Sequence, residues 1–521
     1  MIPSDGHVSS VALLHDFLIE SARRLPDKVG LVCGDARLSY AALEARSNSL
    51  AHALVQRGVG RGDRVVVFAD NTVEAVLSFW AVLKTNAVVV MVNPQTKADK
   101  LAYLLNDCRA RALVTDGHLA SAYRPAVAAA PHLASVIVAG EAEVSALPGG
   151  VSFAAAEHGG PRHEAPLRRA IDVDLASIIY TSGSTGEPKG VMLTHANMLA
   201  AATSITAYLE NVEDDVILGV LPLAFDYGLY QMIMAFKVGG RLLLERSFTF
   251  PAQVLARVVA EGVTGFPGVP TMFSILAEMK SARSYDFGTV RYVTNTAAAL
   301  TDRHVASIRD IFPRARLFSM YGLTECKRCT YLPPEDLARK PGSVGIAIPN
   351  TEIWIADDDG RRLGPGLVGQ LVVRGATVMR GYWEKPEATA RKLRPGPLPG
   401  EQVLYTGDLC RLDDDGYLYF VARMDDVIKS RGEKVAPKEV ETVLMNVPGV
   451  KAAAVIGVDD AILGQAVKAF VVLEDGAALG ERELQRACQE RLESFMVPKH
   501  IVLVPELPLT TSGKIKKTGL S

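Results

Sequence analysis

The chain has 521 residues, a formal net charge of −2, 49% hydrophobic residues and 22% charged residues. This length exceeds what one hydrophobic core usually supports, so at least two domains are expected. The charge excludes the electrostatic footprint of a nucleic-acid-binding or membrane-surface protein, and the six cysteines are too few for a disulfide scaffold.

The N-terminal part of the chain alternates helix-like and strand-like segments. Apolar residues at helical spacing predict an amphipathic helix over residues 11–25. Strands and helices are then predicted in alternation over residues 64–68, 72–84, 87–92, 98–106, 112–115 and 134–139. This alternation indicates an α/β fold with largely parallel sheets. No apolar run approaches the roughly 20 residues of a membrane span, and we expect a soluble cytoplasmic protein.

A strand-like segment at residues 178–180 leads into a loop rich in glycine and hydroxyl side chains. Glycine lets backbone N–H groups approach phosphate oxygens closely, and a hydroxyl is available to a magnesium shell. The loop is not a Walker A motif, because Lys189 follows Pro188 and precedes Gly190. The sequence therefore predicts a polyphosphate-binding loop made by Thr181, Ser182, Gly183, Ser184, Thr185, Gly186 and Lys189.

The pattern of predicted secondary structure changes twice beyond this region. Residues 345–421 contain short β-type segments separated by Asp-Gly and Pro-Gly turns. After Arg423, helix-like and strand-like segments provide enough elements for a small α+β domain. We therefore expect a large N-terminal domain over 1–424, built of α/β subdomains and a β-rich subdomain. A small, mobile α+β lid domain would occupy residues 425–521.

Five motifs, in order along nearly the whole chain, resemble those of the AMP-forming adenylating superfamily of acyl-CoA synthetases, aryl-CoA ligases and peptide-synthetase adenylation domains. They are the loop at 181–190, YGLTE at 321–325, YTGDL at 405–409, RMD at 423–425 and TSGKI at 511–515. The resemblance implies an enzyme that uses ATP and Mg²⁺ to convert a small carboxylic acid into an acyl-adenylate. The acyl group would then pass to the thiol of coenzyme A or of a carrier-protein phosphopantetheine.

The resemblance also implies roles for individual residues. Thr185 and Glu325 would hold Mg²⁺, and Asp408 and Arg423 would bind the ribose. The remaining ATP-binding set would be Thr296, Ala297, Ala298, Tyr321, Gly322 and Thr324. Lys514 would bridge the carboxylate and the α-phosphate during adenylation. The lid domain would then pivot at Asp425, bringing Lys429 to the site for thioester formation.

Some of these residues have ordinary structural interpretations as well. Without the resemblance, Thr324 followed by Glu325 suggests a helix cap, and Asp408 after a glycine suggests a turn. Cys326 and Cys329 have C-x-x-C spacing, but no second pair accompanies them, so no zinc site is expected. Cys326 is better explained as a pocket wall.

The acyl site is where the sequence departs from the family. Phe225 stands where many members have histidine, and Phe225-Asp226 instead resembles peptide-synthetase adenylation domains, whose aspartate binds an α-amino group. Asp226 would either bind an amine or cap a helix starting at Tyr227, and apolar neighbours favour the cap. The predicted acyl-binding residues are Phe225, Asp226, Tyr227, Val269, Met320 and Cys326.

These residues leave three possibilities for the acid and for the acceptor of the acyl group. The favoured one is an apolar acid transferred to coenzyme A or to a carrier protein. The second is a stand-alone amino-acid adenylating ligase that loads a separate acyl or peptidyl carrier protein. The third transfers the acyl group to an amine and forms an amide.

Overall fold

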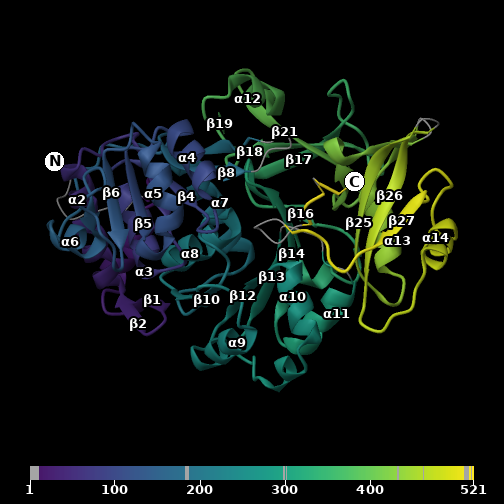
Figure 1. The fold of residues 1–521 in the computed structure, drawn as a ribbon, viewed down its shortest axis with the longest axis horizontal. Coiled ribbons are helices and arrows are strands. Elements are labelled where there is room, and N and C mark those ends of the chain that lie inside the picture. Colours follow the sequence, from purple (N-terminus) through teal and green to yellow (C-terminus); the bar gives the residue numbers. More distant parts are fainter. Residues whose placement is uncertain are drawn as a thin grey trace, which may run out of the picture. The chain divides into compact units, whose positions relative to one another are not determined.

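Figure 1 shows the fold in a computed structural model, which describes residues 11–181, 187–296, 300, 302–430, 433–460, 463–509, 515–517 and 519–520. The chain divides into two compact units. The first comprises Met1–Pro334, Ala347–Glu352 and Arg374–Leu404, and the second comprises Glu335–Ile346, Ile353–Val373 and Tyr405–Ser521. The units differ from the predicted domains 1–424 and 425–521, because parts of the β-rich segment group with the C-terminal residues. The boundary after Met424 stays a prediction.

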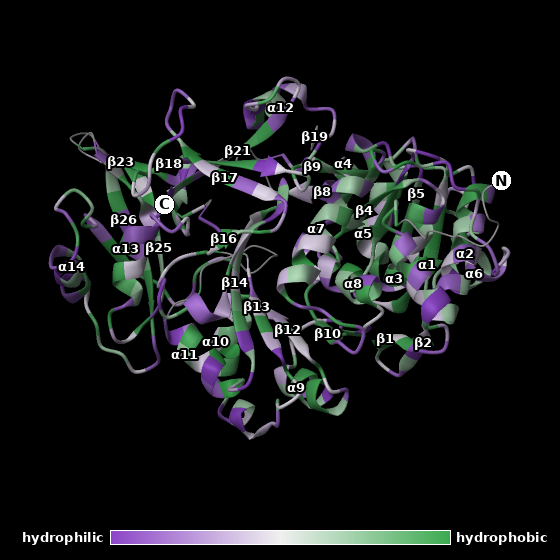
Figure 2. Ribbon diagram, turned by 180° about the vertical axis from the view of Figure 1, so that it is seen from behind, coloured by the Kyte–Doolittle hydropathy of each residue, from purple (hydrophilic) through white to green (hydrophobic). Residues whose placement is uncertain are grey.

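An eight-stranded sheet of the first unit has the order β19-β9-β8-β4-β3-β5-β6-β7. Its strands are Arg64–Phe68 (β3), Val88–Val92 (β4), Ala112–Asp116 (β5), Ser135–Ala139 (β6), Val151–Ser152 (β7), Leu175–Thr181 (β8), Lys189–Thr194 (β9) and Gly381–Tyr382 (β19). Strands β3 to β8 pair in parallel, whereas β8, β9 and β19 pair antiparallel. Strands β3, β4, β5 and β6 are almost wholly buried and largely hydrophobic (Figure 2), which confirms the α/β prediction.

A nine-stranded sheet has the order β16-β15-β14-β13-β12-β10-β11-β1-β2. Its strands are Val29–Cys33 (β1), Ala36–Ser39 (β2), Val216–Gly219 (β10), Arg241–Leu244 (β11), Gly265–Gly268 (β12), Tyr292–Asn295 (β13), Arg316–Leu323 (β14), Cys326–Leu332 (β15) and Ile346–Ala347 (β16). Parallel pairing runs from β1 to β14, and β14 and β15 form an antiparallel hairpin. The carboxyl ends of β13 and β14 therefore lie at the same edge of the sheet.

Helices connect the strands of both sheets. They are Asp16–Arg24 (α1), Tyr40–Gln56 (α2), Val73–Lys84 (α3), Ala98–Asp107 (α4), Ala120–Ala128 (α5), Phe153–His158 (α6), His195–Tyr208 (α7), Asp226–Val238 (α8), Pro251–Ala260 (α9), Pro270–Glu278 (α10) and Asp302–Ile311 (α11). The predicted helix over 11–25 is shorter, because the Asp16 carboxylate accepts the backbone N–H groups of Ala12 and Leu13 ahead of α1.

The predicted β-rich segment forms a five-stranded sheet of Thr351–Ala356 (β17), Gly369–Gly375 (β18), Leu393–Pro395 (β20), Gln402–Leu412 (β21) and Leu418–Arg423 (β22), with Pro386–Lys392 (α12) nearby in the chain. Gly360 and Gly416 have φ values of 84° and 80°, so two of the predicted Asp-Gly turns do require glycine. The C-terminal residues form another five-stranded sheet. Its strands are Ile428–Ser430 (β23), Glu433–Val435 (β24), Val450–Asp460 (β25), Gly464–Leu473 (β26) and His500–Leu503 (β27). The helices of this region are Pro437–Met445 (α13) and Glu481–Gln489 (α14).

The C-terminal sheet and its helices share one hydrophobic core. Val440 and Leu444 of α13 pack with Val455, Val471 and Leu484 in that core. This arrangement matches the small α+β domain predicted from the sequence. Among all the residues that the structure describes, no helix combines the length and apolar character needed to cross a membrane.

His195, the first residue of α7, makes the stability of the fold depend on pH. Its side chain is buried, and its Nδ1 accepts the Leu14 backbone N–H at 3.1 Å. Burial lowers the pKa of His195 to about 4. The unfolded chain binds this proton near pH 6.5, so we expect stability to fall as the pH drops from about 6.5 to about 4, by on the order of 3 kcal/mol from this residue. The free energy of urea unfolding, measured across this pH range, would show the loss. An equally steep loss in His195→Gln would contradict the assignment.

Candidate active site

The structure describes both ends of the predicted phosphate loop. Thr181 ends β8, Lys189 begins β9, and these two residues face each other across antiparallel strands. The loop therefore connects two strands of a hairpin, unlike a Walker A loop, which opens a helix. Ser182, Gly183, Ser184, Thr185 and Gly186 lie outside the described residues, so their phosphate and Mg²⁺ roles stay predictions.

Tyr382 of β19 links the base of this loop to Glu325. The Lys189 ammonium lies 5.7 Å from the centre of the Tyr382 ring, and the Tyr382 hydroxyl donates to Glu325 Oε1 at 2.7 Å. The backbone N–H of Met379 donates to the Glu325 carbonyl at 2.8 Å, which fixes the position of the residue. A predicted phosphate-binding cation and a predicted Mg²⁺ ligand thus share one tyrosine. Sequence reasoning missed Tyr382, because no local motif marks it.

Thr324 and Glu325 form the turn between β14 and β15, so the interpretation as a helix cap is wrong. The segments on both sides of these two residues pair as antiparallel strands, so the chain forms a hairpin turn here and no helix begins. Tyr321 and Gly322 lie in the last part of β14. A Cβ atom added to Gly322 would lie 2.9 Å from the Arg328 Cα, so the packing of this hairpin requires glycine there.

The residues predicted beside the adenine follow β13. Thr296 is buried immediately after the strand, whereas Ala297 and Ala298 lie outside the described residues. The neighbouring Thr294 accepts the Tyr227 hydroxyl through its carbonyl oxygen at 2.9 Å, and the two hydroxyls are 2.7 Å apart. Helix α8 is thereby attached to the end of β13.

The second unit brings the two predicted ribose-binding residues together. Asp408 of β21 and Arg423 of β22 are direct partners in the antiparallel register, with 3.3 Å between Arg423 Nε and Asp408 Oδ1. The Asp408 side chain is 3% exposed and that of Arg423 is 52% exposed. The carboxylate is therefore held in place by the sheet, whereas the guanidinium reaches solvent.

The other residues predicted in the C-terminal part are only partly described. Asp425 lies in the exposed turn Met424–Asp426 (η4). Lys429 belongs to β23, and its side chain is outside the described part of the structure, as is the whole of Lys514. Their roles stay predictions.

Helix α8 begins one residue earlier than predicted, so the helix-cap interpretation of Asp226 is wrong. The N-cap is Phe225, and no side chain caps the helix. Asp226 is instead the first helical residue, and its carboxylate lies 3.0 Å from the Lys327 Nζ. The Asp226 carboxylate thus pairs with the ammonium of Lys327 from β15, whereas a capping aspartate would accept backbone N–H groups of the first helical turn.

The other predicted acyl-binding residues differ in burial. Tyr227, Met320 and Cys326 are buried, whereas Phe225 and Val269 are half-buried at the starts of α8 and α10. The Tyr208 hydroxyl donates a hydrogen bond to the Met320 Sδ at 2.9 Å, and the Cys326 Sγ lies 3.3 Å from the Thr377 hydroxyl. Cys326 is thus a buried wall residue in a hydrogen-bonded setting.

Two buried cations next to Asp226 were missed by the sequence analysis. Lys327 and Arg328 follow Cys326 in β15, and their side chains are buried. Burial lowers the pKa of Lys327 to about 7, although Asp226 opposes this effect. The expected apolar surroundings of Asp226 are therefore charged. Consecutive cations usually indicate a solvated surface, so nothing in the local sequence marks these two as buried.

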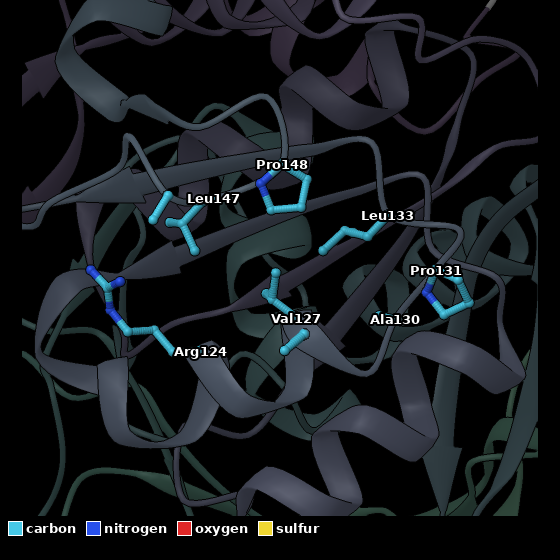
Figure 3. Close-up of a pocket in the computed structure, with 9 residues that line it drawn as sticks. Arg124, Val127, Ala130, Pro131, Leu133, Leu147 and Pro148 are labelled. Atoms are coloured by element: carbon cyan, nitrogen blue, oxygen red, sulfur yellow. The ribbon is translucent and has the colours of Figure 1, made fainter.

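Two cavities of the first unit lie away from these residues. One, of about 410 Å³, is bordered by Arg124, Val127, Leu133 and Pro148 (Figure 3). The other, of about 660 Å³, is bordered by Asp116 and His118, whose ligand-type atoms lie within 4.8 Å of one another and of those of Asp70. The Asp70 carboxylate lies 3.0 Å from His118 Nε2 and pairs with Arg246, and the Asp116 carboxylate accepts the Asp70 backbone N–H at 2.9 Å.

Comparison with known proteins identifies a family and relatives for this chain. The chain matches the AMP-binding enzyme family over residues 18–383 and the AMP-binding enzyme C-terminal domain over residues 439–514. It is 31% identical to a long-chain-fatty-acid–CoA ligase of Escherichia coli O157:H7 over 100% of this chain and 96% of that protein. It is 33% identical to a feruloyl-CoA synthase of Amycolatopsis sp over 96% of both chains. The ATP-bound crystal structure of MatB from Rhodopseudomonas palustris superimposes with a TM-score of 0.86, 29% identity and coverage of 96% of this chain and 97% of that one.

Proposed function

The chain belongs to the AMP-binding enzyme family, and on that premise we propose that it activates a carboxylic acid as an acyl-adenylate and transfers the acyl group to coenzyme A. The family and the CoA ligases among the relatives imply the use of ATP and coenzyme A. The observation that carries the proposal is the contact of Tyr382 with both Lys189 and Glu325. A carrier-protein phosphopantetheine is the alternative thiol acceptor.

The adenylation step requires that an anionic carboxylate attack an anionic α-phosphate, so charge must be neutralised where they meet. Glu325 is a suitable Mg²⁺ ligand, because Mg²⁺ prefers carboxylate oxygens and Tyr382 orients this carboxylate by a hydrogen bond. Bound Mg²⁺ would offset the charge of the phosphates. In this proposal Lys189 adds a positive charge beside the same tyrosine, and Thr185 is the second metal-binding residue.

The remaining roles are proposed by resemblance to the family. The loop from Thr181 to Gly186 binds the phosphates, and Asp408 with Arg423 binds the ribose. Lys514 acts in adenylation and Lys429 in thioester formation, with a pivot at Asp425. The adenine contacts would come from Thr296, Ala297, Ala298, Tyr321, Gly322 and Thr324.

Among the described residues, the contacts of Asp226 do not favour the amino-acid alternative, and no contact bears on the amide-forming one. An amine-binding aspartate would need to accept a substrate ammonium. Asp226 already accepts the ammonium of Lys327 at 3.0 Å. We therefore propose a carboxylic acid without an α-amino group as the substrate.

The proposed function is tested by ATP–pyrophosphate exchange with a panel of fatty, aryl, dicarboxylic and amino acids. Exchange that depends on a carboxylic acid is expected, and mass spectrometry should detect an acyl-CoA when coenzyme A is added. Exchange with amino acids alone would refute the proposed substrate. Absence of exchange with every acid would refute adenylation itself.

Glu325→Gln is expected to lower kcat/KM for exchange about 10²-fold, because a neutral amide loses the charge that binds Mg²⁺ and balances the phosphates. The Mg²⁺ concentration for half-maximal rate should rise as well. Tyr382→Phe should lose only about tenfold, because it removes one hydrogen bond to a charged group. The exposed Glu335 offers a matched control, Glu335→Gln. A wild-type Mg²⁺ dependence in Glu325→Gln would contradict the metal role.

A further inference from the structure

The hairpin of β14 and β15 contains a bulge that changes where the β15 side chains point. Its register passes from Tyr321 opposite Thr330 to Leu323 opposite Cys326, so two steps along β14 face four steps along β15. Arg328 lies inside the bulge with a φ of 58°, a conformation that residues other than glycine rarely adopt. Such bulges re-aim side chains and are frequent next to functional sites.

The bulge directs two consecutive cations to the same helix. In a regular strand, neighbouring side chains point to opposite faces of the sheet. Here the Lys327 Nζ lies 4.9 Å from the centre of the Tyr230 ring, and the Arg328 Cζ lies 4.8 Å from the centre of the Tyr227 ring. Both rings belong to α8, so both cations face the beginning of this helix.

In the described part of the chain, one of the two buried cations pairs with a carboxylate and the other does not. The Lys327 side chain is 4% exposed and pairs with Asp226, and Arg328 is 2% exposed. Across the part of the chain that the structure describes, no carboxylate forms an ion pair with Arg328, and its buried Nε has no hydrogen-bond partner. Burying a guanidinium without an anionic partner is strongly unfavourable. A bound anion would compensate this charge.

We infer that Lys327, Arg328 and Asp226 form a subsite for a second carboxylate on the acid that the enzyme activates. This inference rests on the proposed function. The planar guanidinium fork matches a carboxylate in two parallel hydrogen bonds. The Tyr227 ring packs against the guanidinium, and its hydroxyl donates a hydrogen bond to the Thr294 carbonyl oxygen. The pair is open to solvent at Asp226, whose side chain is 24% exposed.

The reactive carboxylate is a less suitable occupant of this subsite. It must meet the phosphates of ATP, and the groups proposed to handle these phosphates, Lys189 and Glu325, contact Tyr382 of β19. The two buried cations instead pack on α8. A dicarboxylic acid would use both sets of contacts, one for each carboxylate. The substrate class is therefore a dicarboxylic acid, not the apolar acid expected from the sequence.

ATP–pyrophosphate exchange with pairs of acids that share a carbon skeleton, one monocarboxylic and one dicarboxylic, tests the inference. The wild-type enzyme should prefer the dicarboxylic member by at least about tenfold in kcat/KM. Arg328→Asn, chosen because asparagine tolerates a positive φ, should abolish most of this preference, an about tenfold or larger fall in the ratio of kcat/KM values. Arg328→Lys keeps the charge without the fork and should have an intermediate ratio. The exposed Arg314 supplies the matched control, Arg314→Asn, which should keep the wild-type ratio.

The outcomes separate this inference from the proposed function. Equal or better use of monocarboxylic acids by the wild-type enzyme would overturn the subsite and leave acid activation intact. An unchanged preference for dicarboxylic acids in Arg328→Asn would also overturn the subsite. It would mean that the two cations serve only to pack β15 against α8. Exchange with no acid at all would overturn both. The wild-type comparison decides the question even if the Arg328 variants do not fold.

Discussion

Replacing Lys514 by alanine is expected to slow adenylate formation about 10²–10³-fold, while ATP binding stays within about twofold of the wild-type value. The resemblance assigns this ammonium to the charge that develops between the attacking carboxylate and the α-phosphate. Such a contact strengthens in the transition state, so its loss should lower kcat more than it changes nucleotide affinity. Pyrophosphate exchange measures the first quantity, and calorimetric titration with ATP measures the second.

A neighbouring lysine provides the control for this experiment. Lys516 is exposed, and Lys516→Ala should keep wild-type exchange. Acyl transfer from a supplied acyl-adenylate to coenzyme A should also survive in Lys514→Ala, because that half-reaction follows adenylation. Full exchange activity in Lys514→Ala would refute the assigned role. Loss of ATP binding together with exchange would point to a role in nucleotide binding instead.

Replacing Gly228 by alanine is expected to destabilise the protein by about 3 kcal/mol, although alanine is the better helix former. Gly228 lies in the first turn of α8, where an added Cβ would be 2.3 Å from the Pro222 carbonyl oxygen and 2.6 Å from that of Leu221. Both obstacles are backbone atoms, so the helix start itself must shift. That shift would displace Asp226 and lower acid activation as well. Urea unfolding gives the free energy, and pyrophosphate exchange gives the activity.

Gly364 allows the same substitution at a position without steric conflict. No atom lies within 4 Å of a Cβ added there. Gly364→Ala should therefore change the free energy of unfolding by no more than about 0.5 kcal/mol. Wild-type stability in Gly228→Ala would show that the start of α8 can relax, and the steric explanation for this glycine would fail.

The sequence by itself determined the features that depend on neighbouring residues. The strand at Arg64–Phe68 has the predicted bounds, and α3 begins one residue after its predicted start, because side-chain period and capping residues act locally. The pairing of Asp408 with Arg423 was also accessible, since a single hairpin joins their strands. The family resemblance extended this information to the reaction, because the motifs occur in order along the chain.

Tertiary structure decided the contacts between distant segments. Tyr382 meets Glu325 across 57 positions of sequence, and no local pattern marks it as a partner. Local rules predicted that Asp226 would cap its helix, but Lys327 from β15 supplies a stronger charge partner. The bulge at Arg328 turns what looks like a solvated charged pair into two buried cations. Charge compensation is a property of what surrounds a side chain in space, so only the folded chain could reveal the proposed carboxylate subsite.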